Sequence, residues 1–323
     1  MPSDSRLLLL DKNQVEALLR PDDVLQAVRE AFILHSAGVG RLFPVVKEPL
    51  EPGSAFSIRS GDVQARGLLG FKAAGFWPRN REQGSEAHQA TILLIDPATG
   101  RPICVIDGNA VTTMRTGAAG ALGLLHLARQ DSTHACLFGT GVQARIQLSY
   151  ALQVLPALRH VRYVTSGLQR DVIFEAHFAK RCHIVHATDR NAAVAESDIV
   201  ITATPGAGPL FDRDAVRPGT HLNCVGADTR GKRELPEGLL TEVCLVVDDR
   251  TQARQIGETQ WAPDTPCTEL GDLIAGKIQA PRHPMSITVF DMTGIALQDL
   301  MVAHLLRERA VAANEGSSVA WAW

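Results

Sequence analysis

Short apolar runs alternate with longer amphipathic segments through the second half of the sequence, from about residue 130 onward. The runs are rich in β-branched side chains, which is typical of strands that are buried on both faces of a sheet. This alternation predicts stacked strand–helix–strand units on a parallel, doubly wound sheet. The predicted strands cover residues 135–138, 161–165, 183–186, 198–204, 221–225, 243–247 and 286–290.

The first of these strands runs directly into a glycine-bearing turn, and a helix follows from Val142. In the pattern G-x-G-x-x-A, Gly139 allows the tight turn and Gly141 allows the backbone to approach a pyrophosphate. Ala144 keeps the helix close to the strand, and the N-terminus of the helix attracts phosphates. The motif in this setting predicts a Rossmann domain that binds NAD or NADP. A strand-to-helix turn without a ligand is the alternative.

Loops at the carboxyl ends of neighbouring strands should complete this site, because open α/β sheets bind their ligands there. The segment 202–205 is one such loop, although it can also be a plain strand end closed by Pro205. Besides the two glycines, the expected cofactor contacts in these loops are Thr140, Val142, Gln143, Thr202, Ala203, Thr204, Val225 and Gly226.

The end of the second strand bears on the choice between NAD and NADP. A carboxylate at this point binds the ribose hydroxyls of NAD, whereas the 2′-phosphate of NADP needs neutral donors and a cation. The sequence has Ser166 and Arg170 here and no acid between residues 165 and 170. This favours NADP modestly. Arg170 can equally be a solvated residue of the next helix.

The first half of the chain has the pattern of an α+β domain. A helix is predicted around residues 24–31, and strands at 55–58, 68–73 and 91–95. Pro97 and Gly100 predict a hairpin between residues 91–95 and 102–106. A last helix, 294–312, should return to this domain, and the tail that ends in Trp323 shows no readable element. We expect a dinucleotide-binding domain at 126–294 and a smaller α+β domain from residues 1–125 and 295–323.

Composition narrows the class of protein. A net charge of −3 and a pI near 6.4 give no basic surface for nucleic acid. The six cysteines form no C-x-x-C pair, so neither a zinc site nor a disulfide framework is predicted. Only four leucines, at 7–10, precede Asp11, which is too short for a signal sequence or a membrane span. We therefore expect a cytoplasmic protein without a metal.

Two cations lie in apolar surroundings in the first domain. Lys72 follows Gly70-Phe71, and Arg115 lies in the segment 112–116. An unpaired buried charge is costly, so each needs an anionic partner. That partner is either a substrate or an internal acid. Asp228, which follows the strand at 221–225, is a candidate for both a catalytic role and the internal ion pair.

These segments together resemble the ornithine cyclodeaminase/mu-crystallin family. The resemblance spans most of the chain, in order. It rests on Gly-Phe-Lys at 70–72, Asp-Pro-Ala-Thr-Gly at 96–100, Thr-Thr-Met-Arg-Thr at 112–116, the turn at 139–145, the segment 198–205, Pro-Gly-Thr-His at 218–221, the segment 225–235 and Phe-Asp-Met-Thr-Gly-Ile-Ala at 290–296.

The resemblance implies a homodimer in which the smaller domain binds substrate and forms the dimer contact. It also implies hydride exchange at the α-carbon of an amino acid through a C=N intermediate. Lys72, Arg115 and Lys47 would hold the α-carboxylate, and Asp228 or Lys72 would handle the proton at the nitrogen. Thr113, Thr293 and Gly294 would contact the cofactor.

Some residues depart from the family's cyclodeaminases. The acid and the Met-Pro pair that accompany the distal amine of ornithine are missing from residues 55–60, where Arg59 adds a cation. Arg59 would suit a second substrate carboxylate, or it can be a surface strand residue. His88 would donate to a carboxylate or shuttle a proton, although a lone histidine is more often structural. Met292 stands where the family commonly has serine.

We therefore expect an NAD(P)H-dependent reductase of a small α-imino acid, with Δ1-pyrroline-2-carboxylate or a related ketimine as the leading substrate. The alternatives are an iminosuccinate reductase or an alanine-dehydrogenase-like enzyme, and then an ornithine cyclodeaminase. The non-enzymatic alternative is a mu-crystallin-like protein that binds NADPH or another ligand. Such a storage protein would not need Lys72, Arg115 and Asp228 together.

Overall fold

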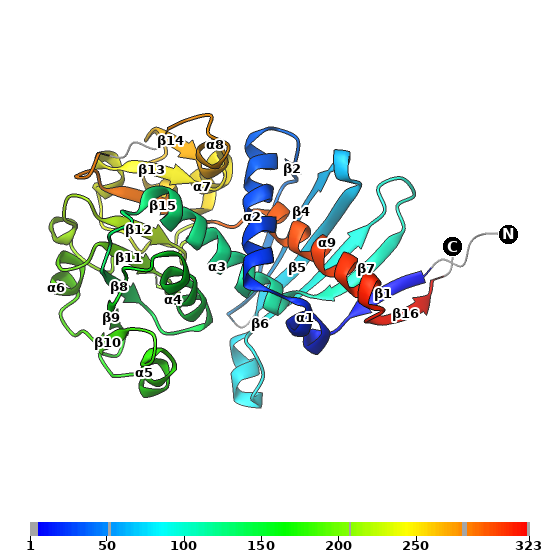
Figure 1. Ribbon diagram of the computed structural model, residues 1–323, viewed down its shortest axis with the longest axis horizontal. Coiled ribbons are helices and arrows are strands. Elements are labelled where there is room, and N and C mark those ends of the chain that lie inside the picture. Colours follow the sequence, from blue (N-terminus) through cyan, green and yellow to red (C-terminus); the bar gives the residue numbers. More distant parts are fainter. Residues whose placement is uncertain (1–5, 51–52, 207, 280–282, 322–323) are drawn as a thin grey trace. The chain divides into compact units, whose positions relative to one another are not determined.

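The structure is a computed structural model that describes residues 6–50, 53–206, 208–279 and 283–321 (Figure 1). The chain divides into two compact units, of which unit 1 comprises residues 1–115 and 295–323 and unit 2 comprises residues 116–294. The division falls inside α3 (Gly108–Leu127), whereas the sequence placed it near residue 125. A helix keeps its periodicity where its packing partners change, so the pattern alone could not locate this point.

Unit 2 contains an eight-stranded parallel sheet in the order β10-β9-β8-β11-β12-β15-β13-β14. All seven predicted strands are confirmed, with small shifts at their ends. The eighth strand, β14, was missed because three residues are too few for a pattern. The bounds are β8 (His134–Phe138), β9 (His160–Val164), β10 (His183–His186), β11 (Ile199–Thr202), β12 (His221–Cys224), β13 (Cys244–Val247), β14 (Cys267–Glu269) and β15 (Thr288–Asp291).

The two faces of this sheet carry separate apolar cores, which confirms the doubly wound prediction. Along β8, Cys136 and Phe138 enter one cluster, while Ala135 and Leu137 enter the other. Such alternation follows from the twofold period of a strand. The helices of unit 2 besides α3 are α4 (Val142–Val154), α5 (Val172–Phe178), α6 (Arg190–Ala195), α7 (Arg250–Ile256) and α8 (Leu270–Ile274), with short 3₁₀ turns η3 (Arg213–Ala215), η4 (Leu239–Glu242) and η5 (Glu258–Trp261).

The strand order of unit 2 reverses between β8 and β11, because β9 and β10 continue on one side and β12 on the other. At such a switch point, neighbouring loops leave the carboxyl ends of the strands in opposite directions and leave room for a ligand. The glycine-bearing turn follows β8, and the loop with Thr204 follows β11. The topology therefore places both predicted nucleotide loops at the expected edge of the sheet.

Unit 1 contains a second, mostly antiparallel sheet in the order β16-β1-β7-β6-β5-β4-β2, with β3 also paired to β4. The predicted strands and the hairpin between β6 and β7 are confirmed. The bounds are β1 (Arg6–Leu10), β2 (Arg41–Leu42), β3 (Val46–Leu50), β4 (Ser54–Val63), β5 (Leu68–Phe76), β6 (His88–Ile95), β7 (Pro102–Asp107) and β16 (Ser317–Ala320).

The C-terminal tail was predicted to have no readable element, and this was wrong for residues 317–320. They form β16, an edge strand that pairs antiparallel with β1. The pairing partner lies at the other end of the sequence, so local periodicity could not reveal it. Ala322 and Trp323, which the sequence analysis included in this tail, lie outside the described residues.

Helices α2 (Pro21–Ser36) and α9 (Ala296–Ala313) confirm the two predicted helices and pack against each other. In Figure 1, α9 crosses the sheet of unit 1, where it contacts β4, β5 and β6. Unit 1 also has α1 (Lys12–Leu18), η1 (Gln64–Arg66) and η2 (Pro78–Gln83). Among the described residues, no helix combines the length and apolar character needed to cross a lipid bilayer.

Candidate functional site

Four of the predicted substrate-binding residues lie on one face of the sheet of unit 1. Arg59 in β4 is directly opposite Lys72 in β5. Lys47 in β3 is opposite Ser57, two residues from Arg59, and His88 in β6 is opposite Phe76, four residues from Lys72. Opposed residues and those at even spacing share a face of a sheet. The register therefore directs three cations and a histidine to the same side.

Two helices contribute to the same side. The Nζ atom of Lys72 donates to Asp299 Oδ1 of α9 at 2.8 Å and to Thr112 Oγ1 of α3 at 3.1 Å. Arg115 of α3 donates from Nε to the same Asp299 oxygen at 3.1 Å and from Nη1 to Gln298 Oε1 at 3.0 Å. The internal acid that pairs with both cations is thus Asp299, and the sequence analysis had considered Asp228 for this role.

Asp299 was missed because it lies more than 180 residues from either cation. A usable signal was present, since this acid stands in a helical stretch whose neighbours, such as Leu297 and Leu300, are fully buried. An acid in a buried helix face needs a cationic partner.

Three basic side chains and one acid of this group are buried. Arg59, Lys72 and Arg115 are 9%, 3% and 8% exposed, and the carboxylate that pairs with two of them is Asp299. The expectation that Arg59 can be a surface residue is therefore wrong. The second carboxylate oxygen of Asp299, Oδ2, has no hydrogen-bond partner among the described residues. Several buried basic side chains and an open acceptor are features of a site that binds an anionic molecule with an N–H group.

Burial and neighbouring charges shift the protonation of this group. Burial lowers the pKa of Lys72 to about 7, opposed by Asp299 and assisted by Arg115. Burial also opposes ionisation of Asp299, but the charges of Arg115 and Lys72 outweigh it and lower the pKa of this acid. The pKa of His88 is lowered by burial and by Lys72, so the imidazole is neutral at neutral pH. Lys72 is therefore the group that changes charge near neutrality.

The glycine-bearing turn of unit 2 has the predicted geometry. Gly139 adopts a φ of 101°, and a Cβ there would lie 2.7 Å from the carbonyl oxygen of Ala203. Gly141 is the N-cap of α4, and a Cβ there would meet nothing within 4 Å. Val142 and Gln143 begin the helix. The first glycine is thus required by backbone packing, and the second leaves open space in front of a helix N-terminus, which is the space that a pyrophosphate needs.

Two buried acids, which the sequence analysis missed, hold the other nucleotide loops of unit 2. Glu234 accepts from the backbone N–H of Thr204 at 2.8 Å and of Gly226 at 2.9 Å, and so joins the loops after β11 and β12. Asp248 accepts from Thr293 Oγ1 at 2.6 Å and from the backbone N–H of Gly294. Four predicted cofactor contacts are thereby positioned by carboxylates. Thr202, Ala203 and Val225 lie in or beside the same two strand ends.

Arg170 precedes α5 rather than lying in it, and its side chain is 67% exposed. Its guanidinium donates from Nε to Glu175 Oε1 at 3.0 Å and from Nη2 to Oε2 at 2.5 Å. This hydrogen bonding, together with that of Tyr163, lowers the pKa of Glu175 to about 2. Arg170 is therefore oriented by an acid while it remains open to solvent, and Ser166 lies in the same loop.

Asp228 lies in unit 2, with 43% of its side chain exposed, and forms an ion pair with Lys232 at 2.8 Å. Thr113 lies in α3, where its hydroxyl donates to the carbonyl of Asn109 at 3.1 Å. Met292 is buried directly after β15. These residues are held by neighbours in the chain, and their roles in binding or catalysis are treated below as proposals.

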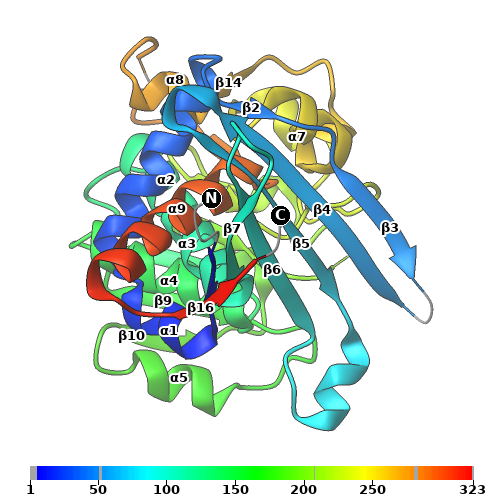
Figure 2. The ribbon, with the colours of Figure 1, turned by 90° about the vertical axis from the view of Figure 1, so that its right-hand side faces the viewer.

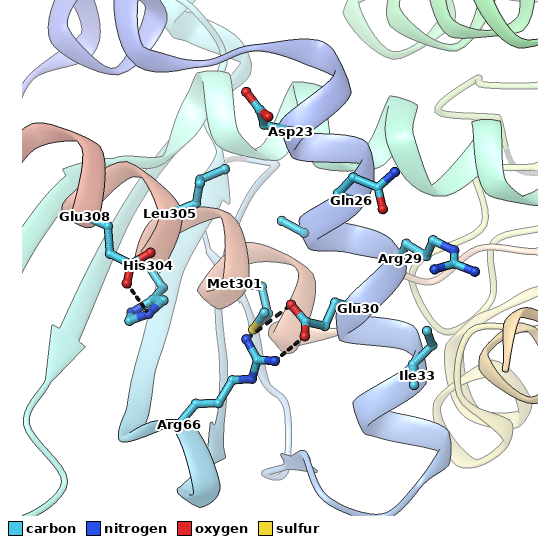
Figure 3. A pocket seen from close by; sticks show the side chains of 11 residues that line it. Asp23, Gln26, Arg29, Glu30, Ile33, Arg66, Met301, His304, Leu305 and Glu308 are labelled. Atoms are coloured by element: carbon cyan, nitrogen blue, oxygen red, sulfur yellow. Dashed lines mark hydrogen bonds and ion pairs between the residues drawn. The ribbon is translucent and has the colours of Figure 1, made fainter.

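Unit 1 also has a groove of about 460 Å³ between α2 and α9 (Figure 3). Its charged side chains pair with one another, as in Glu30 with Arg66 and His304 with Glu308. The groove is lined by two arginines and one histidine beside three acids: Arg29, Arg66, His304, Asp23, Glu30 and Glu308. The groove therefore lacks the excess of basic over acidic side chains found in the cluster around Lys72.

Several solved structures are similar to this chain over nearly its whole length. An archaeal alanine dehydrogenase, described as a dimer with bound NAD, is 31% identical and superposes with a TM-score of 0.90 over 97% of this chain and 99% of that chain. The Δ1-pyrroline-2-carboxylate reductase of Thermococcus litoralis, in complex with NADH and L-proline, is 28% identical, with a TM-score of 0.89 over 97% and 100% of the chains.

The iminosuccinate reductase of Paracoccus denitrificans, in complex with NAD⁺, is also 28% identical, with a TM-score of 0.89 over 97% and 99% of the chains. The sequence pattern of the ornithine cyclodeaminase/mu-crystallin family matches residues 6–314, which is nearly the whole chain. The chain therefore belongs to the ornithine cyclodeaminase/mu-crystallin family.

Proposed function

We propose that this protein is an NAD(P)H-dependent reductase that converts a small α-imino acid, Δ1-pyrroline-2-carboxylate or a related ketimine, into the amino acid. The observation that carries the proposal is the buried cluster of three basic side chains, Arg59, Lys72 and Arg115, around the acid Asp299. A carboxylate next to a C=N group would be bound by these basic side chains. The relatives that reduce such imines support the same reaction.

Lys72 and Arg115, with Lys47 from β3, hold the α-carboxylate of the substrate. Charge-assisted hydrogen bonds of this kind are strong and directional. Fixing the carboxylate also fixes the adjacent imine carbon, which lowers the entropic cost of reaching the reactive geometry. The neutral imidazole of His88 is available for the remaining polar groups of the substrate.

The reduced nicotinamide, when bound, supplies the hydride for the imine carbon. The open space at Gly141 fits its pyrophosphate, and Thr113, Thr293 and Gly294 are proposed contacts for the nicotinamide part. Ser166 and the exposed, oriented guanidinium of Arg170 favour NADPH over NADH, because a 2′-phosphate binds to neutral donors and a cation.

A proton must reach the nitrogen as the hydride reaches the carbon. Lys72 is suited to give it, because its pKa of about 7 allows both protonation states near neutrality. Asp228 is the second candidate, and the ion pair with Lys232 would then hold it in place. In either case the cations that hold the substrate carboxylate also place the nitrogen. The donated proton compensates the negative charge that the hydride brings to the C–N group.

One panel of assays tests the proposal. Oxidation of NADPH and NADH is followed at 340 nm with Δ1-pyrroline-2-carboxylate, Δ1-piperideine-2-carboxylate, iminosuccinate, and pyruvate with ammonia. We expect turnover with the cyclic imines and a lower KM for NADPH. Turnover with pyruvate and ammonia alone would indicate an alanine dehydrogenase. Release of ammonia and proline from ornithine, without net oxidation of the cofactor, would indicate a cyclodeaminase. Binding of NADPH without oxidation by any substrate would contradict the enzymatic proposal and favour a ligand-binding protein.

Iminosuccinate reduction is the second candidate, and the burial of Arg59 favours it. Arg59 is 9% exposed and lies beside Lys72 on the same sheet face, so the cluster can neutralise a second carboxylate. Replacing Arg59 with leucine should raise the KM for iminosuccinate by about tenfold to a hundredfold, because a charge-assisted contact is lost. The KM for a monocarboxylic imine should change by about threefold or less.

The matched control for this experiment is Arg66→Leu, which removes a partly exposed arginine of the same unit that pairs with Glu30. It should leave both KM values unchanged. An equal loss for both classes of imine in Arg59→Leu would show that Arg59 does not distinguish a second carboxylate.

We also propose that the protein forms a homodimer through unit 1. Phe56, Ile58, Phe71 and Leu93 lie on the sheet face opposite Lys72 and remain partly exposed. In Figure 2, α2 and α9 lie on one side of β4 and β5, which leaves the other side without these helices. A contiguous apolar surface of this kind favours association.

Light scattering should give a mass of about twice 34.8 kDa, and Phe71→Glu should reduce it to that of one chain. An unchanged mass in this variant would place the contact on another surface.

A further inference from the structure

The position of α9 on the sheet is set by small residues in the strands below it. A Cβ at Gly61 of β4 would lie 2.4 Å from the carbonyl oxygen of Arg41 in the neighbouring strand and 3.4 Å from Leu297 of α9. A Cβ at Gly70 of β5 would lie 2.4 Å from the carbonyl oxygen of Leu93 and 3.0 Å from Leu300 of α9. The two leucines thus approach the sheet at positions where side chains are missing. Asp299 lies between them in sequence, so its carboxylate is brought to Lys72 with little freedom.

Asp299 is the acid that balances the cluster. Its side chain is 1% exposed, and one oxygen accepts from both Lys72 and Arg115. A buried lysine without a carboxylate tends to release its proton, because desolvation disfavours the charged form. In addition, the charges of Arg115 and Arg59 act on Lys72 in the same direction as burial. The attraction of Asp299 opposes all three effects.

We propose that Asp299 is a positioning residue that extends the charged form of Lys72 up to neutral pH and keeps Lys72 aligned with Arg115, so that the substrate carboxylate meets a pair of cations in this range. This inference rests on the proposed function for the identity of the substrate. Asp299 would set the charge of the binding site through Lys72 and Arg115 and would take no part in the reaction itself.

Several groups face Lys72, and their charges decide how carboxylate binding depends on pH. Arg59 from β4 and Arg115 from α3 stay charged over the whole accessible range, and Lys47 from β3 lies on the same face of the sheet. His88 from β6 has a lowered pKa and stays neutral above it. Affinity for a carboxylate should therefore fall as the pH rises through the pKa of Lys72, near 7.

The test uses pyrrole-2-carboxylate, a planar carboxylate that cannot accept a hydride. Its binding to the full-length protein is measured by calorimetric titration between pH 5.5 and pH 9. In Asp299→Asn the affinity should begin to fall at least about one pH unit lower than in the wild type, because the attraction that raises the pKa of Lys72 is gone. The two proteins should differ by about threefold or less at pH 5.5 and by about tenfold or more at pH 7.5.

Two further variants control the experiment. Glu308→Gln makes the same chemical change at an exposed position of α9 and should behave as the wild type. Asp299→Glu keeps the charge and should keep the wild-type midpoint even if its affinity is lower. A loss of affinity in Asp299→Asn that is equal at every pH would overturn the inference. So would a pH midpoint of binding that moves as far in Asp299→Glu as in Asp299→Asn. If Asp299→Asn does not fold, the midpoint of Asp299→Glu relative to the wild type decides.

This readout is independent of turnover. Wild-type protein that binds pyrrole-2-carboxylate with the expected pH dependence, but oxidises no NADPH with any imine, would contradict the proposed reaction and leave the role of Asp299 intact. An active reductase whose affinity for the carboxylate does not change with pH, in the wild type or in Asp299→Asn, would support the proposed reaction and contradict the role of Asp299.

Discussion

Replacing Lys72 with methionine is expected to lower kcat/KM for the imino acid by about a thousandfold, or about 4 kcal/mol of transition-state stabilisation. The variant loses a charge-assisted contact to the carboxylate and a proton donor matched to neutral pH. Methionine keeps the length and most of the volume of the side chain, so the sheet face should remain packed. Initial rates with saturating NADPH measure the effect.

Two observations separate chemistry from structure in this experiment. Thermal unfolding should show a small loss of stability, since Asp299 keeps Arg115 as a partner. The Kd for NADPH should be unchanged, because the glycine-bearing turn belongs to unit 2. Lys277→Met, at a lysine that is 48% exposed, is the matched control and should retain full activity. A Lys72→Met variant with more than about a tenth of wild-type kcat/KM would contradict the assigned role.

Replacing Gly141 with valine is expected to weaken NADPH binding by about a hundredfold or more without unfolding the protein. Gly141 is the N-cap of α4 with a φ of −71°, which a valine can adopt, and a Cβ there meets no atom within 4 Å. The added side chain therefore costs little in the free protein. It would occupy the space in which the backbone meets the pyrophosphate. Fluorescence titration with NADPH measures the Kd, and the melting temperature checks the fold.

Gly139→Val is the informative comparison. The same substitution two residues earlier should mainly lower the stability of the fold, whereas Gly141→Val should mainly weaken NADPH binding. Gly139 has a φ of 101°, and its Cβ would approach the carbonyl oxygen of Ala203 to 2.7 Å. A β-branched residue is strained in this conformation. We expect a large loss of stability. Normal NADPH binding by Gly141→Val would show that the pyrophosphate does not lie at this turn.

The sequence by itself determined the doubly wound domain, because buried parallel strands and their helices have periodicities that can be read within a few residues. Gly139 and Gly141 could be assigned in the same way, since a turn between a strand and a helix is a local event. The sequence also singled out Lys72 and Arg115, because a cation among apolar residues is conspicuous without any knowledge of the fold.

The tertiary structure alone decided what surrounds those cations. Asp299 reaches Lys72 across 227 positions of the chain, and Arg6 of β1 donates to Ser318 of β16 across 312 positions. Arg59 is buried in a strand that α9 contacts. The same holds for Glu234, whose carboxylate joins two loops that are neighbours only in the folded sheet. Local patterns report the period of a strand or a helix, whereas burial and ion pairing depend on which distant segments the fold brings together.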